Sequence, residues 1–139
     1  GMNALICSFI TRPEHPSYYA FVKSGLTTLG EYWEENPRSH CHDMMGHIVE
    51  WYYNGIAGIQ AEEPGFRKIK ICPYLPESIH EFKCIYRSVA GEISVQVKEE
   101  QDGMVLQVKV PKGVEYQIDT TNLESSREIT AEKIKIEVE

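Results

Sequence analysis

Positive charge is scarce in this chain. Its 139 residues hold 14 Lys and Arg against 21 Asp and Glu, which gives a formal net charge of −7. Affinity for nucleic acid depends mainly on basic side chains that neutralise phosphates, so this balance argues against a nucleic-acid partner. The chain also lacks the run of about 20 apolar residues that spans a bilayer, and no basic region precedes Met2–Ile10. We expect a soluble, cytoplasmic chain without a membrane partner.

Cysteine is sparse as well. The four cysteines show no C-x-x-C spacing and are too few for a disulfide scaffold. They stand at Cys7, Cys41, Cys72 and Cys84. We interpret each as a small buried or half-buried thiol. His40, His42 and His47 are close in sequence, but no cysteine or carboxylate completes a convincing metal set with them. We therefore expect neither a metal nor a cofactor.

Helical periodicity is confined to the first part of the chain. Val22, Leu26, Leu29 and Trp33 recur at helical spacing and predict a helix over residues 17–34, ended by Asn36-Pro37 because the residue before a proline disfavours the helical conformation. A similar apolar pattern predicts a second helix over residues 43–57. That pattern consists of Ile48, Trp51, Tyr52, Ile56 and Ile59.

After Gly58 the apolar residues alternate, which is the pattern of β-strands. Six strands are expected, around residues 69–71, 82–86, 93–97, 104–110, 114–118 and 134–138. Asp102-Gly103 is a hairpin signal because both residues tolerate a positive φ. The fold class predicted is α+β, with two or three N-terminal helices followed by an antiparallel β-sandwich. We expect a helical domain at 1–60, a sandwich domain at 61–139, and a mobile loop at 120–128.

One acidic residue stands out for chemistry. Glu31 lies near the end of the first expected helix, beside Glu34 and Glu35. From its position alone, Glu31 is best interpreted as a solvent-exposed residue at an acidic helix end. The alternative is a catalytic base, because inverting glycoside hydrolysis needs one carboxylate to activate water and a second carboxylic acid about 6.5–9.5 Å away. Glu34 and Glu35 are poor choices for that acid, because neighbours on one helix do not face each other across a substrate.

Polar and aromatic residues near Glu31 admit two interpretations. Ser39 and His42 precede the second helix, where such residues often cap orphan N–H groups, and without further context this capping interpretation is favoured. Trp33 and Trp51 most often indicate a packed core, while the alternative is a ring face offered to a sugar. From the residues alone, Glu31 is the candidate catalytic residue and Trp33 a candidate substrate-binding residue, whereas the capping role is favoured for His42.

Two motifs together resemble the end of the bacterial α-L-rhamnosidase family. The family's G-A-T-T-L-W-E-R-W-D is similar to the stretch from Gly25 to Glu34, which reads GLTTLGEYWE. The family's S-x-N-H-x-M-F-G-S-V-x-E-W-F-Y is similar to the stretch from Ser39 to Tyr53, SHCHDMMGHIVEWYY. An L-A-G-I ending and a G-F-K-x-I-x-I-x-P strand also resemble Ile56–Ile59 and Gly65–Pro73. The resemblance extends over residues 16–118.

This resemblance implies an (α/α)6 toroid followed by a C-terminal β-sandwich, and inverting hydrolysis of α-L-rhamnosides. It implies that Glu31 is the general base and that His42 contacts the sugar. Three departures stand close to these residues: Gly30 replaces a tryptophan, Tyr32 a basic or polar residue, and Cys41 an asparagine. The family's general-acid motif lies upstream of the matched segment, and general-acid help contributes about 10²–10⁴-fold in rate. We therefore expect this chain alone to be inactive.

Other functions stay open. The chain can be a non-catalytic carbohydrate-binding or protein-interaction module, with either the sandwich or the helices as its binding surface. A different six-hairpin glycosidase is a third possibility. In each case the apolar helix stripes that contain Trp33 and Trp51 need a cover, because large apolar patches rarely stay exposed on monomers. We expect a homo-oligomer that associates through the helical half.

Overall fold

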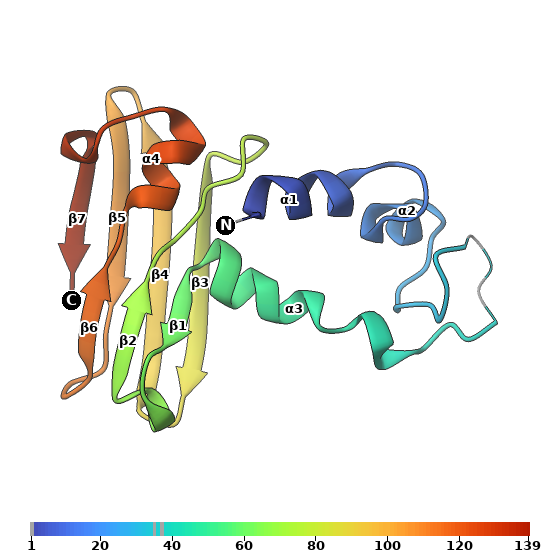
Figure 1. Cartoon of the computed structure of the whole chain (residues 1–139), viewed down its shortest axis with the longest axis horizontal. Helices are drawn as coiled ribbons and strands as arrows, with labels where there is room; N and C mark the ends of the chain where they lie inside the picture. Colours follow the sequence, from blue (N-terminus) through green and yellow to red (C-terminus); the bar gives the residue numbers. More distant parts are fainter. Residues whose placement is uncertain (1, 35, 37) are drawn as a thin grey trace. The chain divides into compact units, whose positions relative to one another are not determined.

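The computed structural model describes residues 2–34, 36 and 38–139, and the chain divides into two compact units, Gly1–Trp51 and Tyr52–Glu139. Helices and loops make up the first unit, and two β-sheets dominate the second (Figure 1). This arrangement confirms the α+β fold class. Within the described part of the chain, no helix combines the length and the apolarity that crossing a membrane requires.

The first unit contains short helices joined by irregular segments. They are α1 (Asn3–Thr11), α2 (Tyr18–Lys23), a 3₁₀ turn (Asp43–Met45) and α3 (Ile48–Trp51). Helix α1 is missing from the sequence predictions, because its pattern is too weakly amphipathic to stand out. Ser17 links it to α2: the buried Ser17 hydroxyl donates to Ile10 O at 3.0 Å and accepts from Tyr19 N at 3.1 Å. Trp51 Nε1 donates to Asn3 Oδ1 at 3.1 Å and so joins α1 to α3.

The predicted helix over 17–34 is wrong beyond Lys23. Gly25 adopts a φ of +80°, and two hydrogen bonds close the helix end: Leu26 N to Phe21 O and Gly25 N to Val22 O, both 3.0 Å. This pair is a Schellman motif, in which a glycine takes the left-handed position. The apolar spacing continued to Trp33 although the chain had already left the helix. Of the expected stop at Asn36-Pro37, Pro37 lies outside the described residues.

The predicted helix over 43–57 is also not continuous. The 3₁₀ turn ends at Met45, α3 begins at Ile48, and a π-helix follows over Tyr52–Ile56. The bond from Ala57 N to Tyr52 O, at 3.1 Å, shows the wider turn. Gly58 then directs the chain into the first strand with a φ of +71°. The apolar spacing predicted the helical region correctly, but spacing alone does not distinguish an α-turn from a wider or tighter one.

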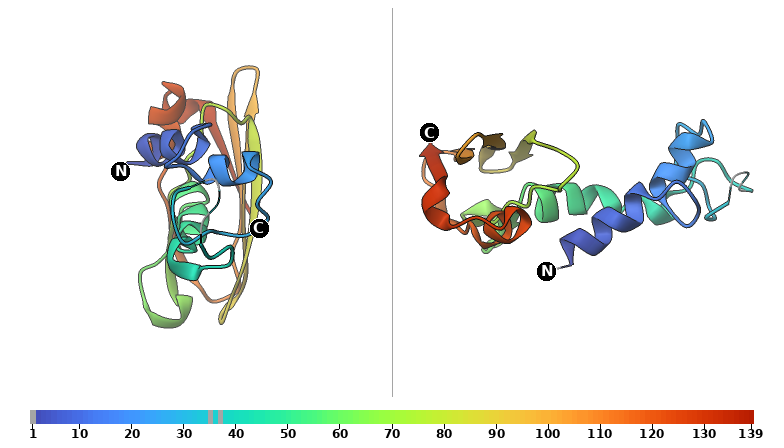
Figure 2. Two further views of the ribbon diagram at one scale, coloured as in Figure 1. Left: turned by 90° about the vertical axis from the view of Figure 1, so that its right-hand side faces the viewer. Right: turned by 90° about the horizontal axis from the view of Figure 1, so that it is seen from above.

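The second unit is a two-layered sandwich (Figure 2). One sheet has the order β1-β2-β6 and the other the order β3-β4-β5-β7. The strands are β1 (Ile59–Ala61), β2 (Lys68–Ile71), β3 (Glu81–Ser88), β4 (Gly91–Glu100), β5 (Gly103–Lys109), β6 (Glu115–Ile118) and β7 (Ile134–Val138), with a 3₁₀ turn at Pro64–Phe66 and another at Ala131–Lys133. All six expected strands are present, and β1 is additional. Their alternating apolar residues fill the core between the layers, and each fully buried one stabilises the fold by about 1.5–3 kcal/mol.

Two features of the sandwich differ from the expectation. Each sheet includes one parallel pair, β2 with β6 and β5 with β7, alongside its antiparallel pairs. The hairpin at Gln101–Asp102 does form, but Gly103 is needed for a close approach: a Cβ there would lie 2.0 Å from Lys133 O. The sequence prediction explained Gly103 by its tolerance of a positive φ. That explanation is wrong, because Gly103 is not among the residues with a positive φ.

The predicted mobile loop at 120–128 is wrong, because it contains helix α4 (Thr121–Arg127). Asp119 Oδ1 accepts from Thr121 N at 3.0 Å and thereby satisfies an N–H group at the start of this helix. Leu123 is fully buried in the core. Polar composition suggested a loop, but the buried Leu123 packs this short helix against the sandwich, and tertiary packing is the main source of stability for short helices.

Candidate functional site

The backbone brings the candidate base and the candidate sugar-contacting histidine into one pair of loops. Glu31 N donates to Ser39 O at 3.0 Å, and His42 N donates to Leu29 O at 2.9 Å. The Thr28 hydroxyl donates to His40 O in the same pairing. Residues 28–31 and 39–42 therefore lie alongside each other, and the Glu31 and His42 side chains, both half-buried, come from neighbouring segments.

His42 also has the structural role of a cap. Its Nδ1 accepts from Met44 N at 3.2 Å and starts the 3₁₀ turn, which confirms the capping interpretation for this residue. An Nδ1 that accepts a hydrogen bond leaves the proton on Nε2, so Nε2 is the nitrogen that can donate to a ligand. Tyr18 holds the same turn from the other end, because its hydroxyl donates to Met45 O at 2.8 Å. In contrast, the Ser39 hydroxyl donates to Cys41 O at 3.4 Å and does not cap.

Trp33 belongs to an aromatic cluster. Its ring stacks on Phe21 with the centroids 5.2 Å apart and an interplanar angle of 14°. Phe9 and Tyr18 lie nearly perpendicular to it, at 5.5 and 5.0 Å. One face of the indole is thus covered by Phe21, which agrees with the core interpretation. Only the remaining half-buried surface of Trp33 is available to a sugar.

The carboxylates nearest Glu31 and His42 in sequence face water. Glu34 is exposed, and the Asp43 side chain is fully exposed, 3.9 Å from His42 Nδ1. The described residues 2–34, 36 and 38–139 contain no group of three or more His, Cys, Asp or Glu that can hold a metal ion. All four cysteines are free thiols, although Cys41 is exposed and not buried as expected. This loop pair can position one carboxylate and one imidazole N–H for a polar ligand.

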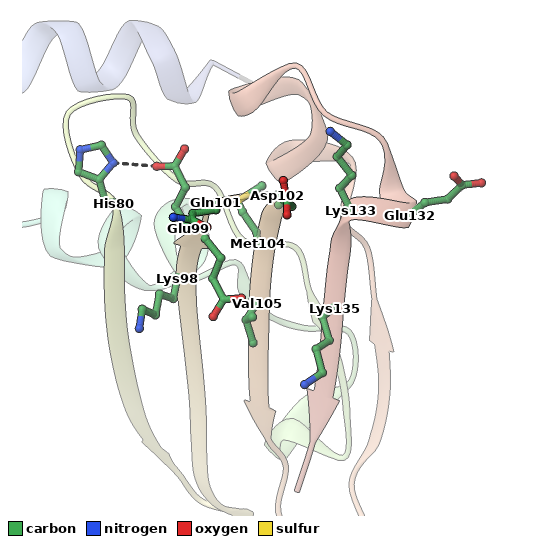
Figure 3. Close-up of a pocket in the computed structure, with 12 residues that line it drawn as sticks. His80, Lys98, Glu99, Gln101, Asp102, Met104, Val105, Glu132, Lys133 and Lys135 are labelled. Atoms are coloured by element: carbon green, nitrogen blue, oxygen red, sulfur yellow. Dashed lines mark hydrogen bonds and ion pairs between the residues drawn. The ribbon is translucent and has the colours of Figure 1, made fainter.

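The sandwich has a groove of its own. It is a depression of about 1100 Å³ at the end of the β4–β5 hairpin (Figure 3). Charged side chains dominate its lining, with His80, Glu99 and three lysines around the opening. The lysines are Lys98, Lys133 and Lys135. Such a surface can offer several hydrogen-bond donors and acceptors to a polar ligand.

Glu99 is the centre of the interactions at this groove. Its Oε2 is 2.7 Å from His80 Nδ1, and its Oε1 is 3.5 Å from Arg127 Nε. The hydrogen bond from His80 and the nearby Arg127 guanidinium lower the pKa of the Glu99 carboxyl. Arg127 in turn donates to Pro76 O at 3.1 Å and to Ile79 O at 2.7 Å. The cluster therefore fixes the segment before β3 onto helix α4.

The sequence offered no sign of this cluster. His80, Glu99 and Arg127 are far apart along the chain, and Arg127 lies in the segment expected to be mobile. Only the crossing of the β2–β3 connection over α4 brings them together. The three candidate residues from the sequence, Glu31, His42 and Trp33, belong to the first unit, whereas the groove is built from the second.

The fold and these loops define the class to which the chain belongs. Residues 58–135 match the bacterial alpha-L-rhamnosidase C-terminal domain. Residues 1–56 match the bacterial alpha-L-rhamnosidase 6 hairpin glycosidase domain. The chain belongs to the bacterial α-L-rhamnosidase family, and it corresponds to a C-terminal portion of such a protein.

Individual relatives agree with this assignment. The chain is 29% identical over 121 residues to an alpha-L-rhamnosidase of Alteromonas sp. (strain LOR), covering 80% of this chain and 13% of that protein. It is 27% identical over 137 residues to one of Formosa agariphila, covering 90% of this chain and 15% of the relative. The solved α-L-rhamnosidase of Dictyoglumus thermophilum is similar with a TM-score of 0.78 and 26% identity, over 85% of this chain and 14% of that one. The chain thus spans about a seventh of the length of these relatives.

Proposed function

We propose that this chain supplies the general base of an α-L-rhamnoside hydrolase. Glu31 activates the attacking water, while His42 Nε2 and the open part of Trp33 contact the sugar. The main observation that supports this proposal is the pairing of the two loops, in which Glu31 N donates to Ser39 O and His42 N donates to Leu29 O. The match of residues 1–56 to the six-hairpin glycosidase domain supports the same assignment.

The general acid is the missing component in this proposal. Inverting hydrolysis needs a second carboxyl group about 6.5–9.5 Å from the base, with room for water between them. Glu34 and Asp43 are exposed and flank the loop pair in sequence, so neither is suited to oppose Glu31 across a sugar. We infer that the acid comes from other six-hairpin segments, and that residues 1–139 alone do not turn over substrate.

A turnover assay on an aryl α-L-rhamnoside tests this directly. The chain alone should release no more product than its Glu31→Gln variant. Glu34→Gln is the matched control, because it makes the same change at an exposed neighbour. Turnover by the unaltered chain and by Glu34→Gln, but not by Glu31→Gln, would refute inactivity while supporting Glu31 as the base.

Binding of L-rhamnose tests the sugar contacts separately from turnover. Addition of L-rhamnose should perturb the NMR signals of the Glu31 and His42 backbone amides, and His42→Ala should weaken the effect. His47→Ala, at an exposed histidine, is the control. Perturbations confined to the second unit would contradict the assignment of these contacts.

A second candidate function is a non-catalytic carbohydrate-binding module. The groove of about 1100 Å³ at the β4–β5 hairpin, with its charged lining, favours this alternative. It requires rhamnose or a plant oligosaccharide to perturb His80, Glu99 and Lys98 in the same NMR titration. The location of the shifts therefore separates the two functions.

We also propose self-association through the helical half. Seven large apolar side chains are exposed in the described part of the first unit: Met2, Leu5, Tyr19, Val22, Tyr32, Met44 and Val49. In a six-hairpin domain, neighbouring helices are the natural cover for such residues. Light scattering should show a species larger than the monomer, and Val22→Glu should reduce it. A clean monomer at high concentration would contradict this proposal.

A further inference from the structure

Among the strands of the described residues, β7 ends its sheet with one edge unpaired, and the charges and apolar residues of β7 are complementary to a second, antiparallel β7. It is the last strand of the order β3-β4-β5-β7, and β6 is the last strand of the other sheet, on the same side of the sandwich (Figure 1). Edge strands present unpaired backbone groups that template pairing with another chain. Pairing at this edge is independent of the rhamnoside hydrolysis proposed above.

The backbone pattern shows which groups face outward. Glu139 N donates to Val108 O, and Val110 N donates to Glu139 O, so both polar groups of Glu139 point toward β5. Because N–H and C=O groups alternate sides along a strand, those of Ile136 and Val138 point to the free edge. Ile134 N–H bonds to Ala131 O, which leaves its carbonyl facing the edge.

The apolar side chains at this edge are incompletely covered. Ile136 and Val138 stand opposite Leu106 and Val108 in register, and therefore on the inner face of the sheet. Leu106 and Val108 are nearly inaccessible, yet Ile136 is 45% and Val138 is 42% exposed. Tyr116 of β6, which is in register with the buried Ile69, is 47% exposed. The sandwich is thus open and apolar along this side.

We propose that β7 pairs antiparallel with β7 of a second copy of this chain, about a two-fold axis through Ile136. The two Ile136 residues then exchange both backbone hydrogen bonds, and each Val138 N–H donates to the partner's Ile134 carbonyl. Ile134 lies opposite Val138 in this register, so the apolar inner face continues from one sheet into the other.

Charge selects this register over its neighbours. With Ile136 on the axis, Lys135 lies opposite Glu137 of the other copy, at the closely spaced positions of an antiparallel pair. A register centred on Lys135 places two lysines opposite each other, and one centred on Glu137 places two glutamates opposite each other. Lysine on an edge strand often prevents pairing. Here Glu137 lies two residues from Lys135 and carries the opposite charge, so the lysine does not prevent pairing. Within one chain, Lys135 Nζ and Glu137 Oε1 already form an ion pair.

The dimer should be weak, because a strand of 5 residues buries less than the ~800 Å² per partner of a standard stable interface. We expect a dissociation constant on the order of 10–100 µM, measured by sedimentation equilibrium on the full chain. Lys135→Glu and Glu137→Lys should each weaken this association about tenfold, because each places like charges opposite at both ends of the interface. Lys112→Glu makes the same charge change at an exposed turn and should leave the association unchanged.

Two combinations separate pairing from misfolding. An equimolar mixture of the Lys135→Glu and Glu137→Lys chains should associate again, because every cross-strand pair is then opposite in charge while each chain keeps its own internal repulsion. The double variant K135E/E137K should also restore association. The proposal is overturned if the unaltered chain stays monomeric at roughly 500 µM, if the single variants associate as tightly as it does, or if the mixture fails to restore pairing. Association that responds to Val22→Glu but not to these variants belongs to the helical half and likewise overturns the β7 proposal.

Discussion

Gly58 sits where the chain enters the sandwich, and its replacement by alanine makes a sharp test of the fold. Gly58 has a φ of +71°, and a Cβ built on it would lie 2.2 Å from Cys72 O. The Gly58 carbonyl also accepts from Cys72 N at 2.9 Å. Ala57 and Ile59 on either side are buried, as is Ile71 before Cys72. The backbone at this point has little room to move.

Three contributions make up the expected loss of stability. A left-handed conformation costs a non-glycine residue about 1–2 kcal/mol, partly offset by about 0.4–1 kcal/mol from the stiffer unfolded chain. The clash forces the two backbones apart, which is an overpacking cost of about 1–3 kcal/mol. Separation also weakens the hydrogen bond from Cys72, worth about 1 kcal/mol. Gly58→Ala should therefore lower the free energy of unfolding by about 3–5 kcal/mol.

Gly113→Ala is the matched control. Gly113 has a φ of +88°, but a Cβ there would meet nothing within 4 Å. It carries the conformational cost without the clash, so its loss should be about 1 kcal/mol. The difference between the two variants isolates the close approach of Gly58 to Cys72.

Urea unfolding followed by far-UV circular dichroism measures both variants. Trp33 and Trp51 belong to the first unit, so tryptophan fluorescence reports that unit separately. The midpoint should fall with an unchanged slope, because the change acts on stability and not on the surface exposed. Equal losses for Gly58→Ala and Gly113→Ala would refute the reasoning, since the contact with Cys72 would then cost nothing.

Two further predictions concern polar contacts of the sandwich. Arg127, with its side chain 12% exposed, donates to Pro76 O and Ile79 O, so Arg127→Met should lower the free energy of unfolding by about 2–3 kcal/mol, measured by urea unfolding. Arg87→Met, at an exposed arginine of β3, should change it by less than about 0.5 kcal/mol. Similar losses for both variants would show that the hydrogen bonds of Arg127 do not stabilise the segment before β3. Hydrogen bonds from Lys70 Nζ and Thr121 hold the pKa of the Asp119 carboxyl well below its usual range. Because the folded pKa is the lower one, this contribution to stability is fully present above the unfolded pKa of about 4 and is lost as the pH falls toward the folded pKa. As the pH falls below 6, the free energy of unfolding should therefore decrease less steeply for Asp119→Asn than for the unaltered chain. Parallel decreases in the two proteins would show that protonation of Asp119 is not linked to unfolding.

Strand periodicity was the most reliable guide to the fold. A side chain in a strand alternates strictly between core and solvent, so Ile69 and Ile71, or Met104, Leu106 and Val108, show their burial in the sequence. Helical spacing was less reliable, because Leu26, Leu29 and Trp33 stay apolar after Gly25 has ended α2. They pack as irregular chain in the first unit, where burial does not require a helix.

The candidate site was only partly predictable. The sequence motifs singled out Glu31 and His42, and the structure brings their two loops together through backbone bonds. It also assigned His42 a capping role and gave Trp33 a stacking partner in Phe21, details that depend on long-range packing. The Glu99 cluster left no trace in the sequence, because His80 and Arg127 reach Glu99 from separate connections.

The sequence by itself determined the order of a helical part before a strand part, the six expected strands and the family to which the chain belongs, since local periodicity and contiguous motifs carry that information. Tertiary structure alone decided the parallel pairing of β6 with β2 and of β7 with β5, the fixing of α4 by Asp119 and Arg127, and the open edge beside Ile136. These features arise from contacts between residues distant along the chain. Which strand ends a sheet, and which carboxylate meets which cation, depends on how the connections cross in space and not on any local pattern.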